Sequence, residues 1–157
     1  MIRISRLTDY GIVLLSFMAT GPARAHSATE LAVGTGLPLP TVSKLLQLLT
    51  REGLLQSQRG AKGGYALARP ASDISVAAIV SALEGPVALT LCTVDPSGDC
   101  EYEGHCRVRG NLLKINLAIQ NALKSISLAE MVQPPAPNGD GSAELSIAAP
   151  PRGELRP

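Results

Sequence analysis

Aromatic residues are scarce in this chain. Tryptophan is absent, phenylalanine occurs once, and aromatic residues make up only 3% of the 157 positions. Any core must therefore consist mainly of Leu, Ile, Val and Ala, and a hydrophobic content of 45% is enough to build one. The length predicts a single domain with an additional arm or tail.

Long hydrophobic runs are missing as well. No apolar run reaches the roughly 18 residues of a membrane span, so no membrane partner is expected. The N-terminal stretch "MIRISRLTDYGIVLLSFMATG" has the hydrophobicity of a signal peptide, but Asp9 lies near the start of its apolar part and the apolar residues have helical spacing. We interpret it as a helix of a folded cytoplasmic protein.

The sequence also lacks the motifs of common enzyme classes. It has no phosphate-binding glycine motif, no nucleophile elbow and only two histidines, of which His26 precedes a helix cap and is expected to be exposed. We therefore expect neither catalysis nor a small-molecule substrate.

The net charge of +1 is unevenly distributed. Residues 1–70 contain eight Lys/Arg and three Asp/Glu and so carry +5, whereas residues 71–133 carry −3 and the remainder −1. The first half is suited to a polyanion such as nucleic acid, although this charge alone is also common in proteins that bind none.

Three helices are expected in the first half. The first covers residues 5–19, and Ser27 with Glu30 forms a capping box for a short helix that Gly34 and Gly36 close. Pro40 marks the first position of the third helix, which ends at Gly53. Its core face consists of Val42, Leu45, Leu46 and Leu49. Two short helices joined by a glycine-containing turn are typical of a helix-turn-helix.

A β-hairpin follows the helix pair. The strand-like runs "LLQSQ" and "YALA" flank "RGAKGG", which gives a glycine-rich tip with Arg59, Lys62 and Gly63. Glycines allow the backbone to lie against a phosphate chain or in a minor groove, and the basic side chains add charge. The alternative is an ordinary exposed hairpin. With the helix pair upstream, residues 1–70 are predicted to form a winged helix-turn-helix that binds double-stranded DNA, mainly α with a small β-hairpin wing.

Residues 71–133 are expected to continue as helices around an irregular stretch. "ISVAAIVSALEGP" forms a helix between Ser75 and Gly85, and Ser127 with Glu130 caps a last short helix. Between them a long helix carries apolar residues at steps of four and three: Val108, Leu112, Ile115, Ile119, Ala122 and Ile126. This spacing is typical of the seam between two paired helices, so a homodimer is expected; the alternative is a core helix of a monomer. Residues 134–157 include six prolines and are predicted to be a disordered tail.

All three cysteines lie in one polar stretch. Cys92, Cys100 and Cys106 fall within fifteen residues, among Pro, Gly and Asp that disfavour regular structure. An odd number of cysteines in a cytoplasmic protein disfavours disulfides and favours metal or redox chemistry.

The ordered set of motifs resembles one family. The segments "RISRLTDYG", "LPTVSKLLQLL", "RGAKGGYALARP", "ISVAAIVSALEGP" and the three-cysteine stretch before a long helix are similar to those of the IscR/NsrR/RirA-type winged-helix repressors, which sense iron–sulfur status or nitric oxide. The likeness covers roughly residues 1–133, and within the family the chain looks most like the regulators of the SUF iron–sulfur assembly system. It implies a transcriptional repressor that binds operator DNA as a dimer.

The resemblance implies that Cys92, Cys100 and Cys106 ligate an iron–sulfur cluster, with 4Fe–4S favoured over 2Fe–2S. The chemistry agrees, because thiolates are the preferred ligands of such clusters. Structural zinc is the alternative, although its cysteines usually lie about two to four residues apart and here seven and five residues intervene. Bare redox thiols are a third interpretation, but a C-x-x-C pair is absent.

The resemblance also suggests a fourth ligand. IscR-like members with a 2Fe–2S cluster have a histidine three residues after the third cysteine, where this chain has Arg109. NsrR-like members carry an aspartate in the first helix that reaches the cluster of the partner subunit, and Asp9 stands at that position. Otherwise Asp9 is a charge that the helix dipole favours, and His105 is interpreted as a solvated surface residue.

The DNA-reading residues are expected on the exposed face of the third helix. Pro38 and Pro40 shape its beginning, Lys44 and Gln47 are placed to contact base edges, and Thr41 and Ser43 suit phosphates or bases. A dimer formed through residues 107–126 would present two such helices to successive major grooves of a palindrome. Cluster occupancy would then shift the spacing of the two helices and hence the DNA affinity.

Overall fold

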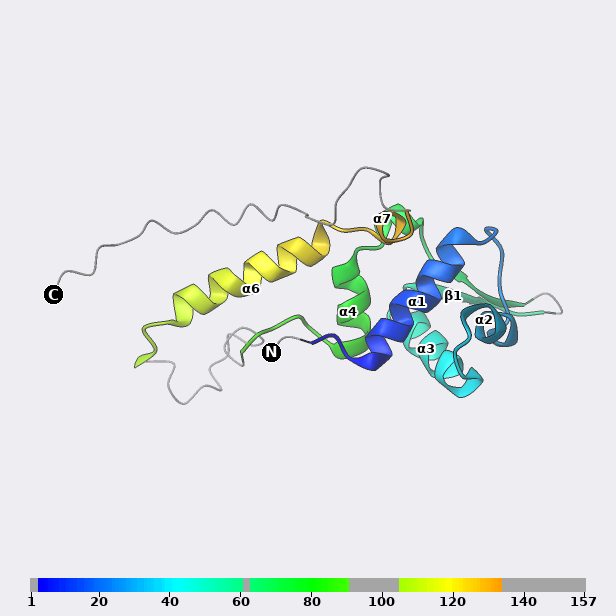
Figure 1. Cartoon of the computed structure of the whole chain (residues 1–157), viewed down its shortest axis with the longest axis horizontal. Helices are drawn as coiled ribbons and strands as arrows, with labels where there is room; N and C mark the ends of the chain where they lie inside the picture. Colours follow the sequence, from blue (N-terminus) through cyan, green and yellow to red (C-terminus); the bar gives the residue numbers. More distant parts are fainter. Residues whose placement is uncertain (1–2, 61–62, 91–104, 134–157) are drawn as a thin grey trace.

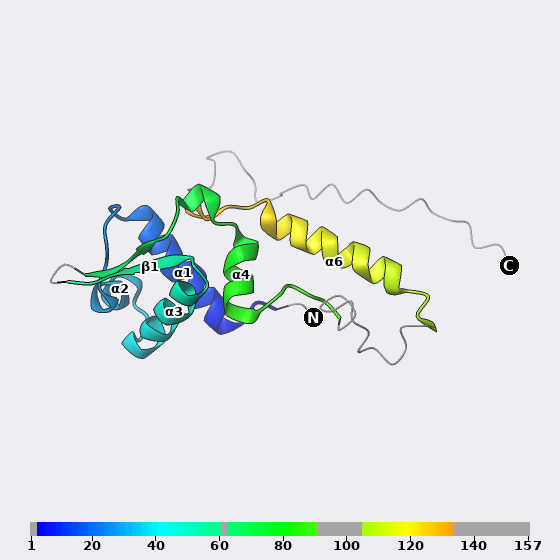
Figure 2. The same cartoon turned by 180° about the vertical axis from the view of Figure 1, so that it is seen from behind.

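The computed structural model describes residues 3–60, 63–90 and 105–133. Among the described residues it places five α-helices and a two-stranded hairpin in one packed unit, from which a long helix extends away (Figures 1 and 2). The mainly helical class with a small hairpin is the predicted one. Cys92, Cys100, Lys62 and the predicted disordered tail lie outside the described residues.

The three helices of the first half form at the predicted places. Helix α1 covers Arg6–Thr20, α2 covers Ala28–Thr35 and α3 covers Leu39–Arg51. The capping box of Ser27 and Glu30 is present, and Gly36 ends α2 with a φ of 71°. Helix α3 begins one residue earlier than predicted, so Pro40 is its second residue. Proline is tolerated there because N–H groups of the first turn have no partner within the helix.

The hairpin consists of β1 (Leu55–Gln58) and β2 (Gly64–Leu67), paired antiparallel with Leu55 opposite Leu67. The linker before α2 joins it through a single isolated β-bridge, in which His26 and Tyr65 exchange two backbone hydrogen bonds of 2.9 Å. Gly64 permits this approach: a Cβ at this position would lie 2.5 Å from the carbonyl oxygen of His26.

One expectation about this linker is wrong. His26 is buried, with only 4% of its surface exposed, although its position before a helix cap predicted an exposed side chain. Its Nε2 lies 3.3 Å from the carbonyl oxygen of Pro22, and its ring packs edge-on to Phe17. The backbone pairing with β2 fixes the linker and thereby turns the imidazole inward.

The second half adds a 3₁₀ turn (Ala71–Asp73), α4 (Val76–Glu84), α6 (Arg109–Lys124) and α7 (Leu128–Met131). The chain returns from α6 to the point where α4 begins. The backbone N–H of Val76 donates to the carbonyl of Ile126 at 2.9 Å, and that of Leu128 donates to Ile74 at 2.7 Å. Helix α7 thus packs against the 3₁₀ turn and α1.

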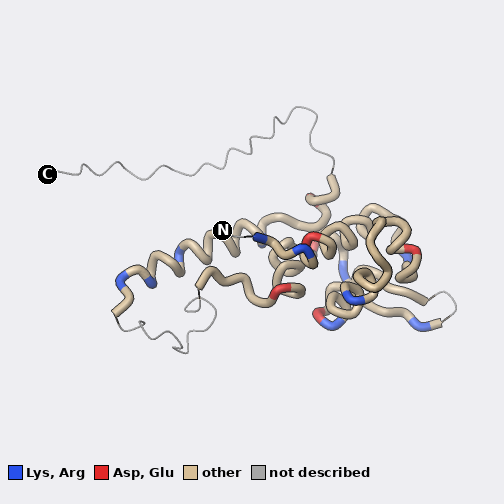
Figure 3. The backbone as a smooth tube through the Cα atoms, turned by 60° about the horizontal axis from the view of Figure 1, so that its bottom comes forward, with Lys and Arg blue, Asp and Glu red and all other residues tan. Residues whose placement is uncertain are grey.

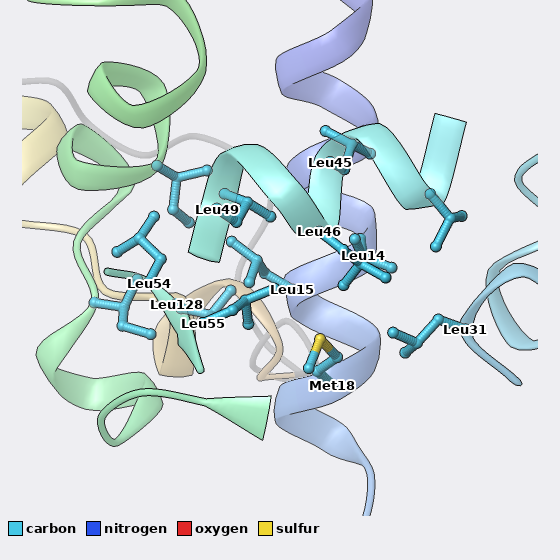
Figure 4. Close-up of a cluster of buried hydrophobic side chains, with 13 residues drawn as sticks. Leu14, Leu15, Met18, Leu31, Leu45, Leu46, Leu49, Leu54, Leu55 and Leu128 are labelled. Carbon is cyan, nitrogen blue, oxygen red and sulfur yellow. The ribbon is translucent and has the colours of Figure 1, made fainter. Parts of the chain in front are cut away.

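One hydrophobic core holds the packed unit together. Figure 4 shows the side chains of α1 and α3 pointing toward one another, with Leu54, Leu55 and Leu128 beside them. The fully buried residues include Leu14, Leu15, Leu31, Val42, Leu45, Leu46, Leu49, Ile74, Ile79 and Leu128. The division into residues 1–70 and 71–133 stays a prediction, and the core draws on both ranges.

Helix α6 contacts the rest of the chain along one side. Oδ1 of Asn116 accepts a hydrogen bond from Leu89 N–H (3.1 Å), and the amide of Gln120 donates to the carbonyl of Val87 (2.9 Å). Many apolar residues of the predicted seam and of its surroundings are exposed: Val108, Leu113, Ile115, Leu117 and Ile126. Since Leu113 and Leu117 lie off the predicted seam, the apolar surface is wider than a narrow two-helix contact. Among the described helices, none has the length and apolar character needed to cross a membrane.

Candidate nucleic-acid interface and metal site

Helix α3 has one buried face and one polar face, as its sequence predicts. Val42, Leu45, Leu46 and Leu49 are fully buried, which fixes the helix against α1. On the other side Lys44 and Gln47 are exposed, while Thr41 and Ser43 are half-buried. The exposed middle of α3 therefore carries the ammonium of Lys44 and the amide of Gln47, both suited to base edges.

The beginning of α3 is apolar and exposed. Pro38, which precedes the helix, provides no side-chain hydrogen bond to its first turn, and Pro40 is exposed as well. Between them Leu39 is 45% exposed. Sequence reasoning missed Leu39 because its spacing of three and seven residues from Val42 and Leu46 assigns it to the core face.

The hairpin tip owes its shape to glycines. The N–H of Gly63 donates to the carbonyl of Gly60 at 2.8 Å, and a Cβ on Gly63 would lie 2.5 Å from the carbonyl oxygen of Gln58. Gly60 has a φ of 118°, which L-residues with side chains rarely adopt. Arg59 is exposed next to this tip. The hairpin therefore requires a residue without a side chain at Gly63, independently of any contact that Gly63 makes with a ligand.

Exposed polar residues also line β1. Gln56 and Gln58 are exposed, whereas Leu55 is buried. Sequence reasoning did not single out these glutamines, although the alternation in "LQSQ" carries the signal.

Two of the basic groups on this unit are not neutralised by neighbours. Lys44 and Arg59 form no ion pair with any residue that the structure describes, whereas Arg51 pairs with Glu52 at 3.0 Å and Arg24 with Glu30 at 2.9 Å. The hydrogen bond from Arg24, together with the N–H of Ser27, lowers the pKa of Glu30 to about 2. Figure 3 shows basic residues beside the hairpin tip and along α6.

The candidate metal ligands are only partly placed. Cys106 is a half-buried free thiol just before α6, and the exposed His105 precedes it. Asp9 is exposed in the first turn of α1. The beginning of α6 lies away from α1 in both views, so the two elements beside these candidate ligands are not neighbours there within one chain (Figures 1 and 2). Among the described residues, no three of His, Cys, Asp and Glu gather as a metal site.

A carboxylate joins the start of α1 to the end of α4. Oε1 of Glu84 accepts a hydrogen bond from the N–H of Ser5 at 2.7 Å. Hydrogen bonds from the Thr8 hydroxyl and from Ser5 lower the pKa of Glu84. This contact sets the turn that carries Asp9 relative to the point where the chain leaves α4 for the cysteines.

Comparison with known families identifies this arrangement. Residues 4–134 match the profile of the Rrf2 family, described as iron-dependent transcriptional regulators. The chain belongs to the Rrf2 family. This confirms the resemblance to IscR-type winged-helix regulators and places the protein among transcriptional regulators rather than enzymes.

The chain is similar to known proteins over most of its length. The curated protein aau3 of Rhizobium meliloti is 29% identical over 131 residues, which are 83% of this chain and 85% of that protein. The structure of T. potens IscR has a TM-score of 0.62 and 29% identity, covering 83% of this chain and 86% of its own. The structure of CymR, the global cysteine regulator of B. subtilis, has a TM-score of 0.63 and 26% identity, covering 84% and 97%.

Proposed function

We propose that this Rrf2 regulator senses an iron–sulfur cluster, binds operator DNA as a homodimer and represses genes of iron–sulfur cluster assembly of the SUF type. One observation carries the proposal: the three cysteines lie directly before α6 in a chain whose family profile is that of iron-dependent transcriptional regulators. DNA is the partner that the winged helix-turn-helix of the family supports.

The donor set suits an iron–sulfur cluster by its chemistry. Cys92, Cys100 and Cys106 would supply three thiolates, which such clusters prefer, and zinc usually requires closer pairs. A bound cluster supplies a group whose stability depends on iron, oxygen and nitric oxide. Asp9 would complete the set from the partner subunit, which agrees with its exposure in the first turn of α1.

The DNA contacts follow from the polar face of α3 and from the wing. Lys44 and Gln47 would read base edges, and Thr41 and Ser43 would contact bases or phosphates. Arg59, Lys62 and the tip around Gly63 would contact phosphates or the minor groove. Because these contacts displace counterions, affinity should fall steeply as salt rises.

The second copy would cover the apolar surface of α6. Val108 is 56%, Leu117 55% and Ile115 49% exposed, and α6 extends beyond the packed unit. An apolar helix surface of this kind gains free energy when it leaves water. Pairing through α6 would set the spacing of the two α3 helices, and the cysteines precede α6 directly.

The residues at the two candidate fourth-ligand positions favour a second function within the family. Arg109 replaces the histidine of 2Fe–2S members, and Asp9 matches the aspartate of NsrR-like members. The alternative is therefore a repressor of the same family that responds to nitric oxide or iron and controls other genes. A zinc-stabilised DNA-binding protein is the alternative for the metal.

Anaerobic purification tests the proposal. We expect a brown protein that contains iron and sulfide and shifts DNA from upstream of its own gene or of a SUF operon, with an affinity that changes when the cluster is removed. A colourless protein with bound zinc would support the zinc alternative instead. If the DNA affinity responds to nitric oxide but not to iron or oxygen, the second function is favoured.

The dimer has its own measurement. Light scattering at micromolar concentration should give twice the mass of the chain, and Ile115→Asp should shift the protein toward monomer. Lys114→Asp is the matched control, because it introduces the same side chain at an exposed polar neighbour on α6. A wild-type monomer would contradict the dimer.

A further inference from the structure

The start of α3 carries no polar side chain at Pro38, Leu39 or Pro40, and its first polar residue, Thr41, is half-buried. Pro38, Leu39 and Pro40 are all exposed, and the side chain of Leu39 is roughly half covered by protein, with 45% of its surface exposed. The two prolines have no backbone N–H, and no side chain caps the helix here. Helix starts usually carry Ser, Thr, Asp or Asn. This turn therefore offers an apolar surface where hydrogen-bonding groups are common.

The residues at the start of a recognition helix are the ones that approach base edges in the major groove. The edges of guanine, cytosine and adenine present hydrogen-bond donors and acceptors there, whereas thymine adds an apolar C5-methyl group. An apolar side chain that covers a polar edge leaves buried groups without partners, which is costly. A methyl group is the base feature that an exposed leucine complements.

We propose that Leu39 contacts the C5-methyl group of a thymine in each half-site of the operator. The inference rests on the DNA binding proposed above and adds a residue that determines sequence preference. Pro38 and Pro40 hold the backbone on both sides of Leu39, since their rings fix φ. Lys44 lies five residues, about 1.4 turns, further along α3 and supplies a polar contact beyond this apolar start.

The experiment starts from a site selected by the full-length protein from random double-stranded DNA. Each thymine of the selected site is then replaced by deoxyuridine, which removes only the methyl group. We expect one position in each half-site at which this replacement raises the Kd of the wild type about fourfold, the value of one buried methyl group. Leu39→Ala should raise the Kd for the thymine site and abolish the difference between thymine and deoxyuridine.

Two controls separate the methyl contact from other effects. Lys44→Ala should weaken binding to both sites and keep their ratio. At the same position, a pair containing 5-methylcytosine should bind more tightly than the unmethylated pair, because the methyl group is the same. Alanine favours helices more than leucine, so Leu39→Ala should fold, and Leu39→Gln provides a second variant with the methyl contact removed.

The outcomes distinguish the two proposals. Enrichment of a sequence without any thymine-to-deoxyuridine effect, or an effect that survives in Leu39→Ala and Leu39→Gln, would overturn the contact with Leu39 and leave DNA binding standing. Failure to enrich any sequence would overturn the proposed function and, with it, this inference.

Discussion

The N–H of Ser5 and the carboxylate of Glu84 form a 2.7 Å hydrogen bond between residues 79 positions apart in the sequence. Ser5 caps α1, and Glu84 is the last residue of α4. Gly85 follows with a φ of 88° and starts the path toward the cysteines. The contact thus connects the turn that carries Asp9 with the segment that precedes the candidate cluster.

This contact predicts a pH dependence of stability. Hydrogen bonds from Thr8 and Ser5 lower the pKa of Glu84 in the folded protein. A lowered folded pKa stabilises the fold above the unfolded value of about 4.3, and the contribution disappears as the pH falls through the folded pKa. Glu84→Gln should therefore lower the melting temperature by a few degrees at pH 7 and have a smaller effect near pH 3, as calorimetry can measure.

The control for Glu84 is another exposed carboxylate. Glu52 pairs with Arg51 at the protein surface, and such exposed pairs contribute little to stability. Glu52→Gln should leave the melting temperature almost unchanged at both pH values. Equal changes in melting temperature for the two substitutions would show that the hydrogen bonds of Glu84 stabilise the fold no more than the exposed pair of Glu52 does.

The wing depends on the absence of a side chain at Gly64. Gly64→Ala would place a methyl group 2.5 Å from the carbonyl oxygen of His26, so backbone atoms must move. We expect a loss of about 1–3 kcal/mol in the free energy of unfolding and weaker DNA binding through a displaced wing. Denaturant unfolding measures the first effect and gel shifts the second.

Gly110→Ala is the matched control. Gly110 lies in the first turn of α6, and a Cβ there would meet no atom within 4 Å. Alanine favours helices more than glycine, so this variant should be neutral or slightly stabilised. A similar loss at both glycines would argue against crowding as the cause.

Local sequence signals predicted the elements well, and tertiary contacts explain where they did not. The capping boxes of Ser27 and Ser127 and the core face of α3 form as predicted, because they depend on residues within one turn or one helix. The burial of His26 depends on pairing with Tyr65, which is 39 positions away in the sequence and has no local signature. The exposure of Leu39 likewise depends on tertiary packing at the start of α3, which the spacing of apolar residues along the helix does not predict.

Part of the candidate site follows from local sequence spacing. Sequence spacing placed Lys44 and Gln47 on the exposed face of α3, where the structure has them. Their roles, and those of the cysteines and Asp9, stay predictions. The predicted contact surface did not include Leu113 and Leu117, because the regular spacing of four and three residues selects only one side of α6.

Substitutions at two lysines should distinguish contacts to bases from contacts to phosphates. Lys44→Ala should reduce binding to the operator more than binding to random DNA, because Lys44 lies on the face of α3 that would read bases. Lys62→Ala should weaken binding to both and reduce the slope of the salt dependence by about one. Fluorescence titrations over a salt series measure both; equal losses on both DNAs for Lys44→Ala would mean that α3 is not the reading helix.

Asp9 can be tested apart from the cysteines. Asp9→Ala should still permit a cluster to assemble on three thiolates, but with a changed absorption spectrum, faster loss to oxygen and a weakened link between cluster state and DNA affinity. Anaerobic reconstitution followed by absorption and circular dichroism, with operator titrations in parallel, provides the measurements. The control is Asp73→Ala, an exposed aspartate of the 3₁₀ turn.

The expected contrast is large. Alanine at any one of the three cysteines should prevent stable cluster binding, whereas Asp73→Ala should match the wild type throughout. If Asp9→Ala also matches the wild type in spectrum, lifetime and DNA response, Asp9 is only a charge at a helix end.

The buried position of Leu128 affects the order of events during synthesis. Leu128 is fully buried in the core around α1 and α3, yet it follows the cysteines and α6 in the sequence. A nascent chain that has completed α4 must wait on the order of seconds before this residue emerges from the ribosome. Until then its core lacks a leucine side chain, a defect that typically costs about 2–5 kcal/mol. Chains that end before α7 should therefore fold less stably, and the packed unit reaches its full stability only after the cysteines have been synthesised.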